Sequence, residues 1–173
     1  NNRIGTKEIF KETTRTYIDI HDNLIFLKDG TSFLWTSERD GFNHIYKFDY
    51  AGDVQQLTKG EWHVVEFMGY DESKKKIYFS SSMKGPTQQH LHSVDFDGNI
   101  ITLDESSGHH SADFSANFSY RIHNHSDANT PPVYTLRDRK GSVVRTLKSN
   151  EDLMNTLSEY DYSAKEFFSF TNS

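Results

Sequence analysis

The chain has 173 residues, of which 34% are hydrophobic and 14% aromatic, and its formal net charge at pH 7 is −6. This length suits one ordinary domain, and the aromatic residues can build a core despite the low hydrophobic share. The acidic balance argues against nucleic acid and anionic membranes as partners, because both require a basic face. Cysteine is absent, which excludes a disulfide framework and cysteine-based metal or redox sites. No signal peptide is recognisable, and no apolar run approaches the roughly 18 residues of a membrane span.

The first predicted element, within residues 1–17, is the end of a preceding structural unit. We expect residues 7–17 to form its closing strand and a loop. Because the chain does not begin with Met, we expect further sequence upstream.

Residues 18–58 are predicted to form one unit of four antiparallel strands. Its short apolar runs cover residues 24–27, 32–35, 44–48 and 54–57, with Asp-Gly or Gly-Asp turns between them. These runs are rich in aromatic and β-branched residues and are too short for helices. Their apolar side chains are expected to form the core; they are Phe26, Phe33, Trp35, Ile45, Tyr46 and Phe48.

The same pattern then recurs twice, over residues 59–103 and 104–147. The closing leucines Leu57, Leu103 and Leu147 are 46 and 44 residues apart, and a turn glycine precedes each closing strand. A period of this length with four strands per unit is typical of a β-propeller blade. We therefore predict an all-β fold of about three four-stranded antiparallel blades, named blade A (18–58), blade B (59–103) and blade C (104–147).

The remaining residues, 148–173, break the period. Asn150 is a capping residue before two acids, and Leu153 and Leu157 are four apart, which predicts a short helix. Residues 165–170 are expected to form a strand, and the aromatic side chains between residues 160 and 170 to form a patch between domains. Since three blades do not close a ring, we expect the exposed blade faces to support self-association.

Two runs of residues carry a resemblance to a known family. Residues 35–46, WTSERDGFNHIY, and residues 56–64, QLTKGEWHV, resemble the propeller domain of the dipeptidyl peptidase IV family, bacterial members included, within the prolyl oligopeptidase family. Shorter matches follow in order as far as Leu153, so the resemblance covers nearly the whole chain from about Tyr17 onward.

The resemblance implies a secreted or periplasmic serine exopeptidase that releases N-terminal X-Pro or X-Ala dipeptides. In that family an eight-bladed propeller caps an α/β-hydrolase domain, and this chain resembles the last three blades. It implies a non-catalytic segment that gates the access of peptide substrates, with the hydrolase domain and the other blades as partners in cis and no cofactor. The alternative is a periplasmic propeller that only binds a protein or glycan.

No catalytic or substrate-binding residue is assigned from the sequence. The G-x-S-x-G elbow that carries the nucleophile in α/β-hydrolases is absent, and Gly141-Ser142 lacks the second glycine. The family's paired glutamates are also absent. The nearest acidic pairs occur in the wrong contexts; they are Asp71-Glu72, Asp104-Glu105 and Glu151-Asp152.

Three further features admit a functional and a structural interpretation. A zinc or nickel site is conceivable at His90, His92, His109, His110, His123 and His125, but solvent-facing positions are favoured, so no metal ligand is assigned. Glu38-Arg39-Asp40 is either a recognition loop or, as favoured, an ion pair at a blade corner. Trp62 either stacks on a ligand or, as favoured, packs between blades.

Overall fold

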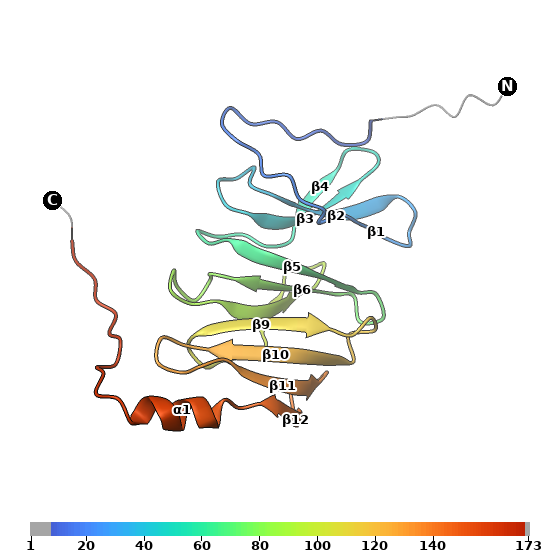
Figure 1. Ribbon diagram of the computed structural model, residues 1–173. Coiled ribbons are helices and arrows are strands. Elements are labelled where there is room, and N and C mark those ends of the chain that lie inside the picture. The colour runs from blue at the N-terminus through green and yellow to red at the C-terminus, as the bar shows by residue number, and fades with distance from the viewer. Residues whose placement is uncertain (1–7, 172–173) are drawn as a thin grey trace.

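The chain forms three four-stranded antiparallel sheets stacked face to face in chain order (Figure 1). The computed structural model describes residues 8–171. Blade A contains β1 (Ile25–Phe26), β2 (Ser32–Ser37), β3 (His44–Asp49) and β4 (Val54–Gln56). Blade B contains β5 (Val64–Asp71), β6 (Lys76–Ser81), β7 (His90–Val94) and β8 (Ile100–Thr102). Blade C contains β9 (His109–Phe114), β10 (Tyr120–Ser126), β11 (Val133–Asp138) and β12 (Val143–Lys148). The predicted all-β propeller fold is therefore confirmed.

Each blade is a meander whose last hairpin turn is fixed by the same device. The side-chain Oδ1 of Asp49 accepts hydrogen bonds from three backbone N–H groups of the following turn, at 2.8–2.9 Å. Asp95 and Asp138 occupy the equivalent positions; Asp95 Oδ1 accepts from two backbone N–H groups of its turn and Asp138 Oδ1 from one. The turn glycine in blade A, Gly52, has φ of 104°, a left-handed conformation that favours glycine. An aspartate followed by a glycine therefore recurs with the period of the blades.

Blades A and B share one apolar core. It is built from side chains of both sheets that are almost completely buried; they are Leu27, Leu34, Ile45, Leu57, Val64, Ile77, Phe79 and Val94. Burying such side chains is the main favourable contribution to packing one blade on the next. We call this contact the A–B seam.

The segment before β1 is an irregular strap, which differs from the closing strand expected within residues 7–17. Residues 1–7 of the expected preceding unit lie outside the described residues. Residues 8–23 contain no strand and lie over the outer face of blade A (Figure 1). The Phe10 ring lies 4.6 Å from the Phe48 ring and 6.1 Å from the Phe33 ring. Glu12 accepts hydrogen bonds from the Trp35 indole and the Ser37 hydroxyl. The strap thus covers a second apolar cluster, on the side of blade A that faces away from blade B.

One of the expected core residues is wrong. Phe26 is 58% exposed, whereas Phe33, Ile45, Tyr46 and Phe48 are buried. Phe26 lies on β1, a strand of only two residues at the edge of its sheet, so fewer neighbours cover its ring.

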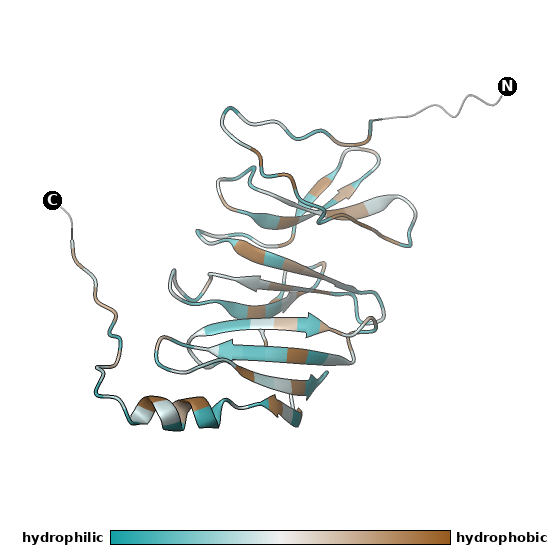
Figure 2. Cartoon of the chain, viewed as in Figure 1, coloured by the Kyte–Doolittle hydropathy of each residue, from teal (hydrophilic) through white to brown (hydrophobic). Residues whose placement is uncertain are grey.

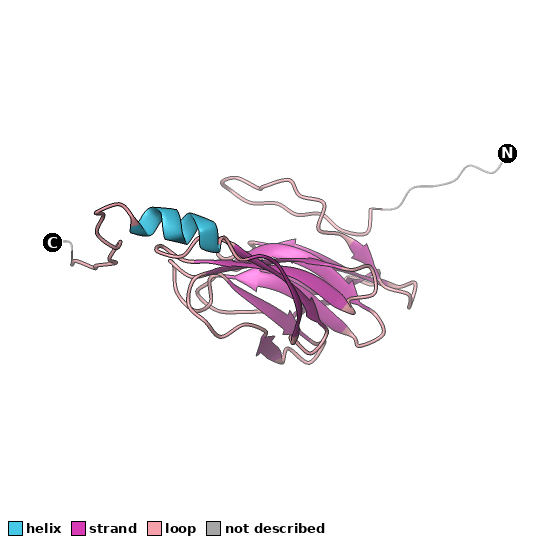
Figure 3. Cartoon of the chain, turned by 60° about the horizontal axis from the view of Figure 1, so that its bottom comes forward, coloured by secondary structure: helices cyan, strands magenta, loops and turns pink. Residues whose placement is uncertain are grey.

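The C-terminal segment contains the predicted helix but lacks the predicted strand. Helix α1 (Glu151–Ser158) lies outside the stack of sheets (Figure 3). Its N-cap residue Asn150 makes no capping hydrogen bond to the helix, and its side-chain amide instead donates to the Pro132 carbonyl. Residues 165–170, expected as a strand, have no regular structure, because no sheet edge of the described chain pairs with them.

Candidate functional site

Blades B and C meet at a contact that combines polar side chains with the aromatic rings of Tyr78, Phe114 and Phe118, which we call the B–C seam. Figure 2 shows that β9 and β10 are mostly hydrophilic along their length. Four histidines of blades B and C are almost without solvent exposure, and we refer to them as the histidine cluster; they are His90, His92, His110 and His123. His90 and His123 contact His110 at the B–C seam, whereas His92 packs on His90 and on Phe79 of the A–B seam. The sequence interpretation that these histidines face solvent is wrong, because stacking of the blades buries both sides of β7. His109 is exposed and His125 is partly buried.

A buried carboxylate lies beside the histidine cluster. Asp104, on the connection between β8 and β9, is 5% exposed. Its Oδ1 accepts a hydrogen bond of 2.8 Å from Arg137 Nη1, and its Oδ2 lies 3.7 Å from Arg121 Nη2. Arg121 is itself 3% exposed, so two guanidinium groups from blade C neutralise one carboxylate contributed by the segment that leaves blade B. A buried carboxylate needs such partners because an unpaired charge is costly away from water.

The hydrogen bonds of His110 and His123 define their tautomers. His110 Nε2 lies 2.7 Å from the Ser106 carbonyl oxygen, which can only accept, so this nitrogen carries the proton. The other ring nitrogen, Nδ1, is then an acceptor and receives the Nε2–H of His123 at 3.0 Å. His123 Nε2 also lies 3.6 Å from Asp104 Oδ1, and its Nδ1 is buried without a partner.

Burial determines the protonation of these rings. It lowers the pKa of His92 and of His123 to about 4, in the second case against the opposing attraction of Asp104. Burial also lowers the pKa of His110 below the ordinary histidine value. These three rings are therefore neutral at pH 7, since the charged form is disfavoured away from water.

The proximity of Ser106 to His110 does not form a nucleophile and base pair. The Ser106 hydroxyl lies 3.5 Å from His110 Nε2, but that nitrogen donates its proton to the carbonyl oxygen of the same serine. A general base must offer a free lone pair to the hydroxyl proton. Ser106 and His110 therefore do not have the geometry for acyl transfer.

The expected ion pair at the blade A corner is replaced by contacts with aromatic rings. The Arg39 guanidinium lies 4.8 Å from the centre of the Phe48 ring and 5.1 Å from that of Tyr46. Its Nε donates to the Ser37 hydroxyl, and among the described residues it makes no ion pair. Arg39 is thus held by cation–π attraction on the face that the strap covers.

The favoured interpretation of Trp62 is confirmed. Its ring stacks on Phe79 of blade B with centroids 6.3 Å apart and an angle of 9°, and it meets His44 of blade A edge-on at 4.7 Å. Trp62 therefore packs between blades.

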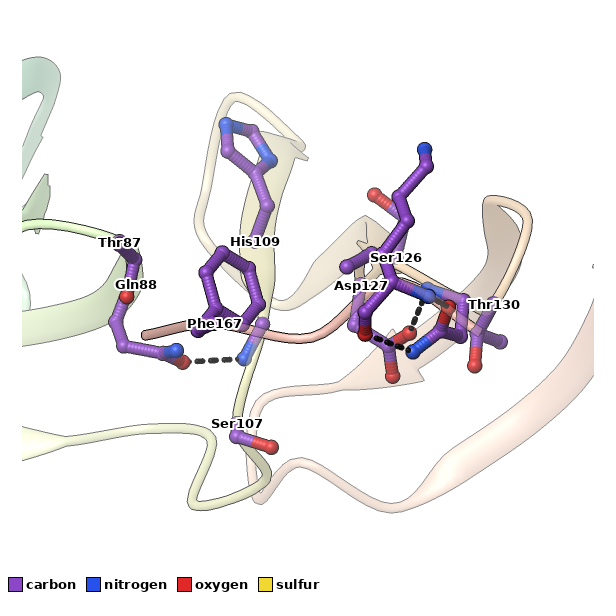
Figure 4. A pocket seen from close by; sticks show the side chains of 12 residues that line it. Thr87, Gln88, Ser107, His109, Ser126, Asp127, Thr130 and Phe167 are labelled. Atoms are coloured by element: carbon purple, nitrogen blue, oxygen red, sulfur yellow. Dashed lines mark hydrogen bonds between the residues drawn. The ribbon is translucent and has the colours of Figure 1, made fainter. Parts of the chain in front are cut away.

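A cavity of about 480 Å³ opens where blade B, blade C and the C-terminal segment meet (Figure 4). Its wall includes Gln88 from blade B, His109 and Asp127 from blade C, and Phe167 from the C-terminal segment. The side chain of Asn129 holds that segment in place: its Oδ1 accepts the Lys165 N–H at 2.8 Å, and its Nδ2 donates to the Lys165 carbonyl at 3.1 Å.

A second cavity, of about 720 Å³, lies between the strap and the β2–β3 turn. Polar groups from both sides line it, including Glu12, His21, Glu38 and Arg39. His21 and Asn23 also bond to Thr36, which ties the end of the strap to β2. Both cavities are therefore completed by segments that flank the blades.

Asp104, Arg121 and Arg137 were missed by sequence reasoning as partners of the histidines. Asp104 lies 17 and 33 residues from Arg121 and Arg137 in the sequence, and these contacts join a connecting segment to the sheet of blade C. Alternation along one strand indicates only which side chains share a face. A sequence signal for these residues is the occurrence of three charged side chains at positions of a mostly polar blade where side chains are expected to point inward.

Within the described residues, no helix is long and apolar enough to cross a membrane.

Comparison with known proteins places the chain among peptidase propellers. The family model described as "Dipeptidyl peptidase IV (DPP IV) N-terminal region" matches residues 2–132. Dipeptidyl peptidase 4 of Trichophyton equinum is 36% identical over 138 residues, which cover 76% of this chain and 18% of that protein. The corresponding protein of Trichophyton rubrum is 35% identical over the same length. The chain therefore matches about a fifth of the length of these relatives.

Solved structures agree with this assignment. The crystal structure of Porphyromonas gingivalis dipeptidyl peptidase 4 superposes with a TM-score of 0.76 and 34% identity, covering 84% of this chain and 21% of that one. A putative dipeptidyl aminopeptidase IV from Bacteroides ovatus gives a TM-score of 0.63 and 27% identity, covering 73% and 21%. The family model matches most of the chain and the three-blade fold agrees with it, so the chain belongs to the family of the dipeptidyl peptidase IV N-terminal region.

Proposed function

We propose that this chain is a non-catalytic propeller segment of a secreted or periplasmic serine dipeptidyl peptidase, in which it controls how peptides reach a catalytic centre on another part of the protein. The observation that carries this proposal is the family match over residues 2–132 in a chain without a G-x-S-x-G elbow. The substrates of the parent enzyme are peptides with Pro or Ala in second position. No residue of this chain is assigned to catalysis, to binding of the substrate amine or to a cofactor.

The arrangement of the flanking segments supports a role at the entrance of a larger cavity. The cavity closed by the C-terminal segment lies at one end of the B–C seam, and the cavity closed by the strap lies beside the β2–β3 turn. Loops and flanking segments such as these carry function on rigid propeller blades. In this proposal the blades form a rigid scaffold, and the strap and the C-terminal segment lie beside the path along which peptides reach the catalytic centre.

The test compares the full-length parent with this chain, using Gly-Pro linked to a chromogenic leaving group. We expect the parent to release the chromophore and this chain to release none. A series of longer peptides with the same Gly-Pro start then tests gating, because sieving lowers kcat/KM as peptide length grows while the short substrate is unaffected. A folded but inactive parent would overturn the peptidase proposal and favour a propeller that only binds.

A further inference from the structure

The B–C seam gathers two imidazoles and a carboxylate in a form that suits a metal ion. Asp104, His110 and His123 each offer one donor atom, and these atoms lie within 4.8 Å of one another. All three side chains are buried, at 5%, 0% and 1% exposure. Imidazole nitrogen together with one carboxylate oxygen is a donor set that zinc, nickel and cobalt accept, whereas calcium and magnesium prefer oxygen alone.

Two of the three distances between donor atoms are close to those expected around a tetrahedral ion. Two ligands at about 2.1 Å from zinc, at the tetrahedral angle, are about 3.4 Å apart. His110 Nδ1 lies 3.0 Å from His123 Nε2, and His123 Nε2 lies 3.6 Å from Asp104 Oδ1. Shifts of a few tenths of an ångström at each side chain would bring these distances to the ideal value.

The surroundings of His110 match those of a metal ligand. Its Nε2–H donates to the Ser106 carbonyl at 2.7 Å, which leaves the lone pair of Nδ1 directed into the cluster. Histidine ligands usually make such an outer hydrogen bond, because it fixes both the tautomer and the ring orientation. The Ser106 carbonyl belongs to the backbone, so this orientation does not depend on a mobile side chain.

Coordination by His123 needs only a change of tautomer. Its Nε2 proton now bonds to His110 and must move to Nδ1, which is buried and without a partner in the described structure. The ring therefore exchanges one hydrogen bond for one metal bond and loses no other partner.

The two arginines decide how strongly an ion can bind. Arg137 Nη1 lies 2.8 Å from the same Asp104 oxygen that faces His123, so an incoming cation must displace it. The Arg137 side chain is 24% exposed and can turn toward water, whereas Arg121 is buried and stays on the Oδ2 side. Repulsion between the ion and these guanidinium groups weakens binding, and removal of Arg137 relieves part of it.

We propose that Asp104, His110 and His123 form a binding site for a divalent transition-metal ion of the zinc, nickel and cobalt class, with Arg137 as the cation that competes for it. The site joins the segment leaving blade B to β9 and β10 of blade C. A bound ion would fasten the two blades to each other. This inference is independent of the proposed function, since it concerns only side chains within the chain.

The experiment titrates the chain with Co²⁺ and follows its visible absorption, then displaces Co²⁺ with Zn²⁺ and measures the melting temperature. Three variants accompany the wild type. His123→Gln removes a ligand, Arg137→Gln keeps all three ligands and removes the competing cation, and His125→Gln removes a neighbouring imidazole that is no ligand. Circular dichroism verifies that each variant folds.

We expect Co²⁺ bands of a nitrogen-oxygen site and a Zn²⁺-dependent rise in melting temperature for the wild type and His125→Gln. The affinity of Arg137→Gln should rise about tenfold or more, within the range typical of outer-shell changes. Co²⁺ binding should be lost in His123→Gln. If this variant does not fold, the Co²⁺ affinity of Arg137→Gln relative to the wild type tests the proposed site instead. Absence of Co²⁺ bands in both wild type and Arg137→Gln, or binding that His123→Gln leaves intact, would overturn the proposal.

Discussion

The Gly60 backbone and the Trp62 indole ring are packed so closely that there is no room for a side-chain methyl group at residue 60. A Cβ at Gly60 would lie 2.3 Å from Trp62 Nε1, and Gly60 has φ of 136°. The Gly60 carbonyl also accepts a hydrogen bond from buried His44. This glycine therefore holds the indole against blade A at the A–B seam.

We predict that Gly60→Ala destabilises the chain by about 1–3 kcal/mol more than Gly52→Ala, the cost typical of overpacking. Gly52 also has a positive φ, but a Cβ there meets nothing within 4 Å. The backbone strain common to both variants then largely cancels, and the difference reports the clash with Trp62. Urea unfolding measures it, and equal midpoints for the two variants would contradict the prediction.

The pKa of His92 predicts how stability depends on pH. Burial lowers this pKa to about 4, from about 6.5 in the unfolded chain. Between these values the unfolded state binds more protons, so the free energy of unfolding is highest above pH 6.5 and falls as pH drops toward 4. The groups around the ring give it little support when charged: Thr102 bonds to Nδ1, Phe79 and His90 pack nearby, and Nε2 has no partner.

We expect His92→Gln to reduce the slope of unfolding free energy against pH in this window by up to about 1.4 kcal/mol per pH unit, the contribution of one proton. His109→Gln is the control, because His109 is exposed. Urea unfolding between pH 4.5 and 7.5 provides the measurement. An unchanged slope in His92→Gln would show that this ring is not the group that takes up the proton.

At the scale of elements, most strands and the C-terminal helix could be predicted from the sequence, whereas the strap and residues 165–170 could not. The strands carry their own signal, because short β-prone runs and Asp-Gly turns act within a few residues. The strap and residues 165–170 also contain apolar and aromatic residues, but a strand requires a neighbour to pair with, and that neighbour is a matter of tertiary structure. The strap is held instead by Phe10 and Glu12, through contacts with side chains more than 20 residues away.

The candidate site was less predictable for the same physical reason. Alternation along β7 and β10 places His90 with His92 and His123 with His125 on shared faces, but it does not say whether a second sheet covers that face. The carboxylate that joins them, Asp104, lies on a connection outside any strand. Burial by blade stacking therefore decides the chemistry of this region.

Asn129 acts on the C-terminal segment as a neighbouring strand would, with one acceptor and one donor for the same residue, Lys165. We predict that Asn129→Ala removes the protection of the Lys165 amide from hydrogen exchange, while the amides of the blades stay protected. Asn129→Asp is the matched variant, since it keeps the acceptor and loses the donor. Asn129→Asp should retain part of the protection of the Lys165 amide. Full protection of this amide in Asn129→Ala would contradict the proposed role of the two hydrogen bonds between Asn129 and Lys165.

At the scale of the whole molecule, the outer face of blade C presents apolar side chains that no described element covers. Tyr120 and Ile122 point to this face from β10, and both are more than 40% exposed. Such patches mark surfaces for association. We expect the isolated chain to self-associate through this face.

The test is light scattering after size exclusion over a range of concentrations, on the wild type and on Ile122→Lys. A charge in the middle of the face should shift the chain toward monomer, because it must be desolvated in any contact. Lys148→Glu changes charge at the edge strand β12 and serves as the comparison. A wild-type chain that is monomeric at every concentration would contradict the prediction of self-association.

The contrast between the two seams has a consequence for the behaviour of the chain in the cold. The A–B seam is almost wholly apolar, whereas the B–C seam combines contacts of Tyr78 with Phe114 and Phe118 with a set of histidine, arginine and aspartate contacts. Burial of apolar surface stabilises less as temperature falls, because it carries a large heat-capacity change, whereas burial of polar surface contributes a heat-capacity change of the opposite sign. On supercooling, blade A would therefore detach first and leave blades B and C as a pair, so that the three repeats, alike in topology, would separate in a fixed order.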